Sequence, residues 1–343
     1  MEIILFLGHT EQDGKLARGA LEVLGAAKDV AVALGAELVA GVFGESTEPA
    51  AAQLAGAGAA RAIAVTGPDF ASARYASDAA ACEALARAAA ATLVLAPGTS
   101  RLARVLPGVS HRLGGHVDTH ATGIAVQDGA PTLTRWFYRQ RMEGTLRRTQ
   151  RPWVVLLDGG CHAALAAEGA APALQQIAVA LTDAQRRTRV VGLKAPRSDA
   201  QTIRPDARLL FVAGAGWTKK QADGKTHTEE AERLILGFLE ASKASLGSSK
   251  SLVDLSGEGN AVLTFMSHLN QVGQTGATPR HPKGLSACCH GEEPHVVGWR
   301  FINERRAINL DPNCGWARGK ADVVYVADAF EVMARVNALL GSR

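Results

Sequence analysis

The sequence has little cysteine, few aromatic residues and no long hydrophobic run. Its five cysteines, at 82, 161, 288, 289 and 314, form no Cys-x-x-Cys pair, and their odd number favours a reducing compartment. No uncharged apolar stretch reaches the roughly 18 residues that a membrane span requires. Met1 to Leu7 is apolar only over the length of one strand and lacks a basic leader or cleavage site. We therefore expect a cytoplasmic protein without membrane insertion.

An excess of charge of one sign is also missing. The formal net charge is +4 over 343 residues, with 37 Lys and Arg against 33 Asp and Glu. Such a small and mixed balance argues against a nucleic-acid partner. At 47% hydrophobic residues the composition is that of a globular protein, and the length suits two domains better than one core.

The first 160 residues alternate short apolar runs with Ala-rich amphipathic segments, a pattern that predicts a parallel sheet covered by helices. The expected strands are 3–7, 37–42, 61–65, 92–96 and 153–157. The expected helices are 16–34, 49–57, 77–90 and 100–113.

Periodicity fades between about 181 and 205, where two prolines and mixed charges indicate a linker. We expect an amino-terminal βα domain at 1–181 that faces a partner, a linker at 182–206, and a second α/β domain at 207–343. In the latter, strands are expected at 208–213, 252–254, 295–299, 307–309 and 323–326, with helices at 229–245 and 329–340.

Three features of the first half allow two interpretations each. Thr99 and Ser100 follow a strand and open a helix, so they either hold a phosphate or cap the helix, and we favour the cap. His116, Asp118 and His120 would share one face if extended and could bind a metal, but we prefer to interpret them as polar residues at a sheet edge that faces a partner, and we predict no metal.

The third feature is a basic and aromatic stretch from Arg135 to Arg151, which includes Trp136, Phe137 and Tyr138. Cations between stacking rings are typical of single-stranded nucleic-acid sites. The same stretch alternates as two antiparallel strands would, and its residue types are enriched where proteins meet. A protein-facing surface is the interpretation that we prefer.

The second half carries several glycine-rich turns, each after a predicted strand. They comprise Gly214-Ala215-Gly216, Gly247-Ser248-Ser249-Lys250, Gln271-Val272-Gly273-Gln274-Thr275-Gly276 and Gly291. Glycine lets backbone N–H groups approach a flat or phosphorylated ligand closely. Because the carboxyl ends of parallel strands lie at one edge of a sheet, we expect these turns to gather there.

These motifs, and the order in which they follow one another along the chain, resemble the FAD-binding domain of electron transfer flavoprotein alpha subunits. The resemblance rests on the Gln271 to Gly276 loop, the Ile308 to Pro312 segment and Ala327-Asp328-Ala329-Phe330. It implies an α/β fold with a parallel βα amino-terminal domain and a carboxy-terminal, doubly wound parallel-sheet domain that binds FAD. It also implies an electron carrier without substrate turnover of its own, which pairs with a beta subunit. Electrons would come from a flavin-dependent dehydrogenase and go to an acceptor such as a quinone oxidoreductase.

The resemblance assigns cofactor contacts residue by residue. Thr275 would meet the flavin edge, Lys250 would bring a positive charge to the ring, and His295 would lie near its pyrimidine end. The full expected set is Gly214, Ala215, Gly216, Ser249, Lys250, Gln271, Val272, Gly273, Gln274, Thr275, Gly276, His290, Gly291, Glu292, Glu293, Pro294, His295, Asn309, Asp328 and Ala329.

Four departures from the family pattern accompany these assignments. Ala215 and Lys250 each stand where the family carries Arg, Glu292 and Glu293 replace apolar residues, and His290 replaces Ser. They motivate an alternative, a flavin-free paralogue that acts as an interaction or regulatory subunit. A nucleotide-hydrolysing enzyme built on the first domain is disfavoured, because no nucleophile, base or metal triad is evident there.

Overall fold

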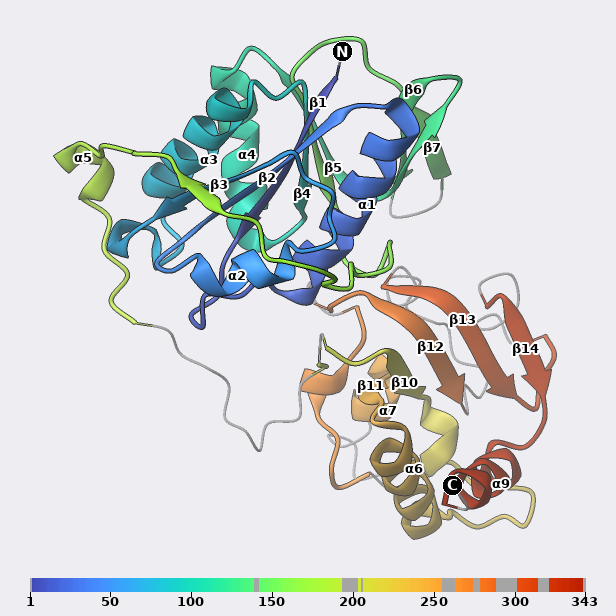
Figure 1. Cartoon of the computed structure of the whole chain (residues 1–343). Helices are drawn as coiled ribbons and strands as arrows, with labels where there is room; N and C mark the ends of the chain where they lie inside the picture. The colour runs from blue at the N-terminus through green and yellow to red at the C-terminus, as the bar shows by residue number, and fades with distance from the viewer. Residues whose placement is uncertain are drawn as a thin grey trace. The chain divides into compact units, whose positions relative to one another are not determined.

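The computed structural model describes residues 2–138, 142–192, 203–204, 206–254, 263–273, 278–287, 301–313 and 321–341. The chain divides into two compact units, Met1–Lys194 and Ala195–Arg343. Each unit contains its own sheet (Figure 1). The predicted fold class, α/β with two separate and mainly parallel sheets, is confirmed.

The sheet of the first unit has nine strands in the order β7-β6-β5-β8-β4-β1-β2-β3-β9. Its buried centre is parallel and consists of β1 (Ile3–His9), β2 (Glu37–Gly44), β3 (Arg61–Thr66), β4 (Leu93–Pro97) and β8 (Trp153–Leu157). These strands read as continuous hydrophobic runs because both faces of a parallel sheet are covered. All five were predicted, and the ends differ by a residue or two.

Helices cover both faces of this sheet. The structure has α1 (Arg18–Leu34), α2 (Glu48–Gln53), the short 3-10 helix η1 (Pro68–Phe70), α3 (Tyr75–Ala89) and α4 (Ser100–Arg112). The core on one face contains the apolar side of α1, and the core on the other face contains those of α3 and α4 (Figure 1). The predicted helix at 49–57 is shorter in the structure, where it ends at Gln53.

An antiparallel extension completes the sheet on the β8 side. It consists of β5 (His116–Gln127), which runs parallel to β8, followed by β6 (Ala130–Phe137) and β7 (Met142–Leu146). The antiparallel pair predicted in the basic, aromatic stretch is thus confirmed. At the opposite edge, β9 (Leu174–Gln176) pairs with β3, and α5 (Asp183–Arg186) follows within the predicted linker.

The second unit has a five-stranded sheet in the order β11-β10-β12-β13-β14, parallel throughout. Its strands are β10 (Leu209–Ala213), β11 (Ser245–Ser248), β12 (His281–Ala287), β13 (Ile302–Asn309) and β14 (Val323–Val326). The chain moves from β10 to β11 on one side and then crosses back to β12 on the other side of β10. The strand order therefore reverses between β10 and β12, which is where open α/β sheets bind ligands.

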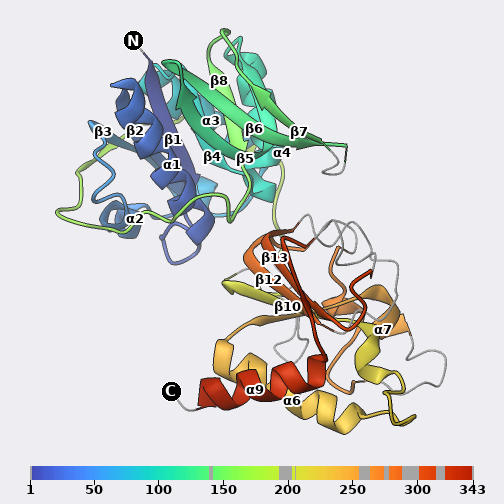
Figure 2. The same ribbon diagram turned by 90° about the vertical axis from the view of Figure 1, so that its right-hand side faces the viewer.

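The helices of the second unit are α6 (Thr228–Ser242), α7 (Lys250–Asp254), α9 (Ala329–Gly341) and the 3-10 helices η2 (Ala215–Thr218) and η4 (His268–Asn270). Helices α6 and α9 lie side by side, and their buried residues join Phe211 and Ala287 of the sheet in one core (Figure 2). No helix of the described residues is long and apolar enough to cross a membrane.

Two predictions for this unit were wrong. The segment 252–254 is the end of helix α7, and the second strand is the small, fully buried β11 before it. Strand β12 was not predicted, because His281, Pro282 and Lys283 at its start mask the apolar alternation. The strand predicted at 295–299 lies outside the described residues.

Candidate functional site

The carboxyl ends of the five parallel strands form one edge of the second sheet. The register places Ala213 of β10 beside Ser248 of β11 and beside Ala287 of β12. Farther along, Ala287 pairs with Ile308, and Asn309 pairs with Val326. The predicted turns that the structure describes follow these positions or, in the case of Gln271–Gly273, lie beside one of them, so segments far apart in sequence meet at this edge.

The turn after β10 connects the centre of the edge to its neighbours. The Gly214 N–H donates to the Ala287 carbonyl at 2.9 Å, and the Ser249 N–H donates to the Ala213 carbonyl at 2.9 Å. Ala215 and Gly216 begin η2 and are buried, and Trp217 packs on Phe330 with 4.6 Å between ring centroids. Ala215 is thus part of the core in this chain, which explains why a small residue stands there.

At the end of β11, three consecutive residues have different environments. Ser248 is fully buried, and its hydroxyl has no hydrogen-bond partner among the residues that the structure describes. The Ser249 hydroxyl accepts from the Leu252 N–H at 3.3 Å and so caps α7. Lys250, the first residue of α7, is exposed.

The Gln271–Gly273 segment is held firmly against β11. Gln271 forms a parallel bridge with Ser248, and the Val272 N–H donates to the Ser248 carbonyl at 3.0 Å. Gly247 makes this approach possible, since a Cβ at that position would lie 2.5 Å from Val272 Cγ2. Gly273 has a φ of 85°, a left-handed conformation that favours glycine. Its N–H donates to the Thr278 hydroxyl at 2.8 Å, which connects the described residues on either side of 274–277.

Two polar residues that flank and hold the Gln271–Gly273 segment were missed in the sequence. Asn270 is buried, accepts from the Ser267 N–H through Oδ1 at 3.1 Å, and donates through Nδ2 to the Leu246 carbonyl at 3.5 Å. The Ser-x-x-Asn spacing from Ser267 to Asn270 is the available signal, because it matches a helix capping box. Thr278 carries no comparable signal.

The far side of the edge contains Asn309, Asp328 and Ala329. Asn309 ends β13, and its side-chain amide donates to the Asp311 carbonyl at 3.4 Å. Asp328 caps α9, because its Oδ1 accepts from the N–H groups of Phe330 at 2.8 Å and Glu331 at 3.1 Å. Ala329 is buried under the first turn of α9.

The remaining predicted contacts fall on Gln274, Thr275, Gly276, His290, Gly291, Glu292, Glu293, Pro294 and His295, which lie outside the described residues. The structure does position the points where these segments begin. One starts after Gly273, beside β11, and the other starts after Ala287, at the end of β12. Both starting points lie at the carboxyl edge.

In the first unit, the turn after β4 shows the favoured capping arrangement. Thr99 is the N-cap of α4, and its hydroxyl accepts from the Leu102 N–H at 3.2 Å. Its hydroxyl also lies 3.3 Å from His9 Nε2. The pKa of His9 is below its usual value, mainly because the ring is buried and secondly because Arg101 is positively charged.

The three residues of the metal hypothesis do not share one environment, because His116 and His120 are exposed while Asp118 is buried. A register shift between Asp118 and Ala121, together with a φ of 55° at His120, also interrupts the alternation of the strand before His120. The Asp118 carboxylate accepts from Arg148, from Arg135 at 3.3 Å and from the Trp153 indole at 2.9 Å. Burial raises the pKa of Asp118, but the hydrogen bonds from Arg148 and Trp153 outweigh it and hold that pKa below its usual value. The described residues contain no group suited to a metal ion.

The arginines of the basic stretch that the structure describes all form ion pairs within the first unit. Arg147 pairs with Asp128 at 2.9 Å, and Arg151 pairs with Glu2, while Arg135 and Arg148 share Asp118. The first three of these pairs therefore connect segments of the β5–β6–β7 extension with one another, and Arg151 connects the chain before β8 to the chain before β1. Tyr138 and Met142 are the exposed large apolar residues of this region.

Comparison with known proteins identifies the family of the chain. Residues 4–182 match the model of the family described as the Electron transfer flavoprotein domain, which covers more than half of the chain. The chain belongs to the electron transfer flavoprotein family. The match covers the first unit up to the predicted linker.

A curated relative extends the similarity to the second unit. The electron transfer flavoprotein subunit alpha of Clostridium acetobutylicum is 26% identical over 338 residues, which cover 96% of this chain and 94% of that protein. The carboxyl edge described above thus lies within the aligned length. Family membership, together with the two-sheet α/β fold, supports an electron transfer flavoprotein subunit.

Proposed function

We propose that this chain is the alpha subunit of a heterodimeric electron transfer flavoprotein and that it binds FAD at the carboxyl edge of the second sheet. The observation that carries the proposal is the anchored Gln271–Gly273 segment, which is bonded to the end of β11 at the carboxyl edge of the sheet. Gly247 lacks the Cβ that would clash with Val272, and Gly273 adopts the left-handed φ at which glycine is favoured. The nearly full-length similarity to an alpha subunit supports the same conclusion.

The residues at this edge fit an FAD molecule. The buried Ser248 hydroxyl lacks a partner among the described residues, and a ligand at the strand ends would supply one. Gly214 and Gly216 lie at the end of the central strand, where pyrophosphate groups approach the backbone in such sheets. Bound FAD supplies the electron-accepting ring, while the protein contributes binding and electrostatics.

Each described residue then has a proposed task. Ser249 and Lys250 meet the ring from β11, with Lys250 bringing a positive charge on a flexible stem. Gln271, Val272 and Gly273 position the 274–277 loop, whose Thr275 hydroxyl contacts the flavin edge. Residues His290 to His295 follow β12 and complete the ring site.

The adenosine portion is proposed to lie toward Asn309, Asp328 and Ala329. Since both Asp328 contacts use Oδ1, the second carboxylate oxygen is able to accept a ligand hydroxyl while the helix cap persists. Ala215 is buried in the core, so it contributes packing beneath the phosphates and no side-chain hydrogen bond.

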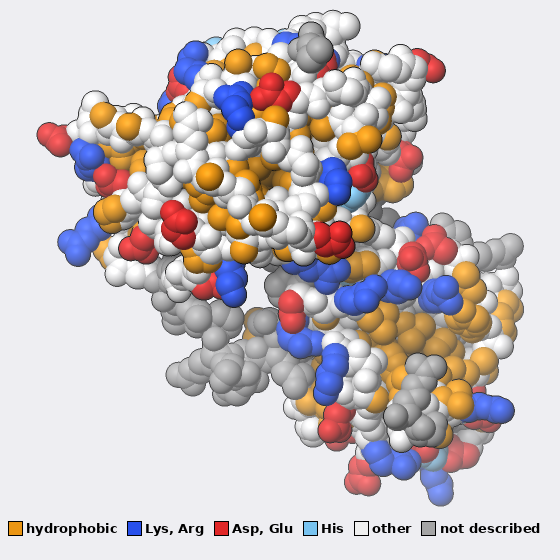
Figure 3. All heavy atoms as spheres, in the orientation of Figure 1, with side chains coloured by type: hydrophobic (Ala, Val, Ile, Leu, Met, Phe, Trp, Pro, Cys, Tyr) orange, Lys and Arg blue, Asp and Glu red, His pale blue; other side chains and the backbone are white. Residues whose placement is uncertain are grey.

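A beta subunit is the proposed partner, with a flavin-dependent dehydrogenase as electron donor and an acceptor such as a quinone oxidoreductase. Figure 3 shows hydrophobic side chains beside a row of Lys and Arg on the part of the second unit that carries β12, β13 and β14. Val323, Tyr325 and Val326 of the edge strand β14 are exposed. An exposed apolar edge of this kind supports a protein partner.

The test is to purify the chain together with its beta subunit and to identify the released flavin by chromatography. We expect a yellow heterodimer that contains FAD and loses the colour of oxidised flavin when a donor dehydrogenase and its substrate are added. A stable heterodimer without flavin would instead support the flavin-free interaction subunit. A well-behaved monomer that ignores the beta subunit would contradict the heterodimer itself.

A further inference from the structure

One side-chain amide connects the turn before the proposed flavin loop to the sheet of the second unit. Asn270 is the last residue of η4 and is only 1% exposed. Its Oδ1 accepts from the Ser267 N–H at 3.1 Å, and its Nδ2 donates to the Leu246 carbonyl of β11 at 3.5 Å. The next residue, Gln271, already forms the bridge to Ser248 at the end of β11. Asn270 therefore lies where the turn reaches the sheet and the anchored segment begins.

Other polar side chains shape the same turn without reaching β11. The Glu232 carboxylate of α6 accepts from the Thr264 N–H at 2.5 Å and from the Thr264 hydroxyl at 2.8 Å. The Ser267 hydroxyl accepts from the Leu269 N–H at 3.3 Å and caps η4. These bonds fix the shape of the turn and its contact with α6. The Asn270 amide adds the contact with β11.

The chemistry of this position requires a neutral amide. An amide has an acceptor and a donor at one end of a short side chain, and Asn270 uses both. A carboxylate would lack the donor for the Leu246 carbonyl and would bring a charge into a buried position. A leucine of similar size would leave the bonds of Asn270 to Ser267 and Leu246 unmade.

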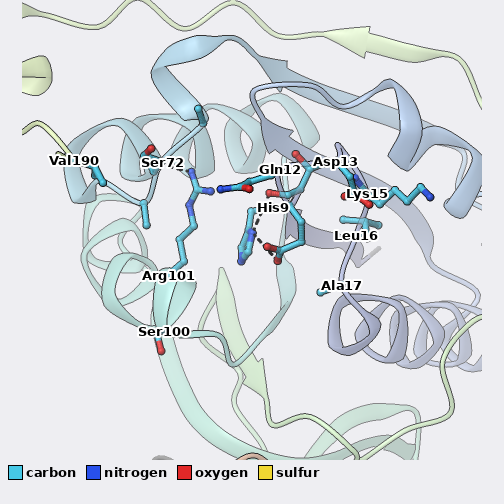
Figure 4. A pocket seen from close by; sticks show the side chains of 14 residues that line it. His9, Gln12, Asp13, Lys15, Leu16, Ala17, Ser72, Ser100, Arg101 and Val190 are labelled. Carbon is cyan, nitrogen blue, oxygen red and sulfur yellow. Dashed lines mark hydrogen bonds and ion pairs between the residues drawn. The ribbon is translucent and has the colours of Figure 1, made fainter. Parts of the chain in front are cut away.

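The first unit holds a turn with the same kind of two-sided amide. Gln53 of α2 accepts from the Leu16 N–H at 2.6 Å and donates to the Leu16 carbonyl at 3.1 Å. Leu16 ends the turn after β1, and Figure 4 shows it at the wall of a cavity together with Gln12, Asp13 and Lys15 of that turn. In each unit, an amide thus fixes a turn against a neighbouring element.

We propose that Asn270 is a positioning residue for the flavin. It acts through the Gln271–Gly273 segment and sets where the 274–277 loop meets the ring, while its own side chain stays in the protein interior. Because the segment is held in place before FAD arrives, little conformational freedom is lost on binding. This inference rests on the proposed FAD site and deepens it.

A matched pair of variants separates positioning from general stability. Asn337 of α9 also donates its amide to a carbonyl of the second unit, that of Leu234 at 2.8 Å. It lies eight residues after the start of α9, about 12 Å along the helix. Asn270→Leu and Asn337→Leu should therefore both lower the melting temperature. Asn270→Leu alone should disturb the segment that leads into the flavin loop.

The measurement is a titration of the full chain with FAD after removal of its flavin, at a temperature below the melting transitions of both variants. We expect Asn270→Leu to weaken FAD binding by at least about tenfold and Asn337→Leu to leave it within about twofold. The midpoint potential of the bound flavin should also shift in Asn270→Leu and keep its wild-type value in Asn337→Leu. Equal FAD affinity of the two variants would overturn the positioning role.

A milder variant keeps the inference testable if Asn270→Leu does not fold. Ser267 is exposed, so Ser267→Ala should fold while it loses the hydroxyl that caps the same turn. We expect its FAD affinity to be at least about twofold lower than that of the wild type. Wild-type affinity in this variant would overturn the inference. Absence of FAD binding by the wild type would instead overturn the proposed function, so the two failures are distinguishable.

Discussion

Gly247 provides a sharp perturbation of the proposed FAD site, because its missing side chain determines how closely the Gln271–Gly273 segment approaches β11. A Cβ at Gly247 would lie 2.5 Å from Val272 Cγ2 and 3.2 Å from Leu210 Cδ1. Nonpolar carbons pack best at about 3.5–4.0 Å, so Val272 would have to move by about 1 Å. That movement would strain the hydrogen bond from the Val272 N–H to the Ser248 carbonyl, now 3.0 Å long.

Gly247→Ala should therefore destabilise the second unit and weaken flavin binding together. Overpacking of this kind costs about 1–3 kcal/mol in the free energy of unfolding. For a unit of this size, each kcal/mol lowers the melting temperature by roughly 2–4 °C. The displaced segment precedes the 274–277 loop, so we also expect less flavin per protein after purification, measured by the ratio of visible to ultraviolet absorbance.

Removing the Val272 side-chain atom that the new Cβ would contact tests whether this clash causes the effects of Gly247→Ala. Val272→Ala deletes the atom that the new Cβ would meet, so the double variant should be more stable than the two single effects predict, by about 1 kcal/mol or more. Thermal unfolding of all four proteins gives this coupling. Wild-type stability and full flavin content in Gly247→Ala, or additive effects in the double variant, would refute the reasoning.

Three further predictions concern other parts of the chain. Asp118→Asn should destabilise the first unit, because Arg148 and Arg135 lose a buried, charged partner. We expect a loss near the low end of about 3–5 kcal/mol in the free energy of unfolding, since Arg148 reaches solvent. An unchanged melting temperature would exclude this role for Asp118. Burial lowers the pKa of His281 from 6.5, so the unfolded state takes up the proton first and stability should fall as the pH drops below about 6.5. Melting curves of His281→Gln should show a smaller loss over that window than wild type, and an equal loss would assign the pH dependence to other groups. Asp328→Ala should destabilise α9 by about 0.5–2 kcal/mol while Asp328→Ser retains most of the stability, because only the serine restores a helix cap; equal melting temperatures of the two variants would contradict the capping role.

Much of the fold could be predicted from the sequence because apolar runs and glycine-rich turns are local signals. The five central strands of the first unit are fully buried, so their runs are uninterrupted. Strand β12 was missed because Pro282 and Lys283 near its start interrupt the apolar pattern. Segment 252–254 was misassigned because three residues of one short helix present the same apolar pattern as a strand.

The candidate site could be predicted only as a set of turns. Family resemblance selected Gln271 to Gly273, but the hydrogen bonds that hold them come from Ser248 and Thr278, which are distant or unremarkable in sequence. The prediction that His116 and His120 share one face was wrong for a similar reason. The irregularity of β5 at Asp118 to Ala121 depends on its pairing with β8, and a single strand's sequence does not encode that pairing.

The most direct test of the central claim is a titration of the flavin-depleted chain with FAD, followed by flavin fluorescence, for two glycine variants. Gly273→Ala and Gly129→Ala both place an alanine in a left-handed conformation, with φ of 85° and 71°, and each strains the backbone by about 1–2 kcal/mol. Gly129 lies in the open turn between β5 and β6 of the first unit, away from the proposed site. We predict saturable FAD binding by the wild type, unchanged affinity in Gly129→Ala and affinity at least about fivefold lower in Gly273→Ala. Absence of FAD binding by the wild type, or equal affinity in the two variants, would contradict a flavin site at the carboxyl edge of the second sheet.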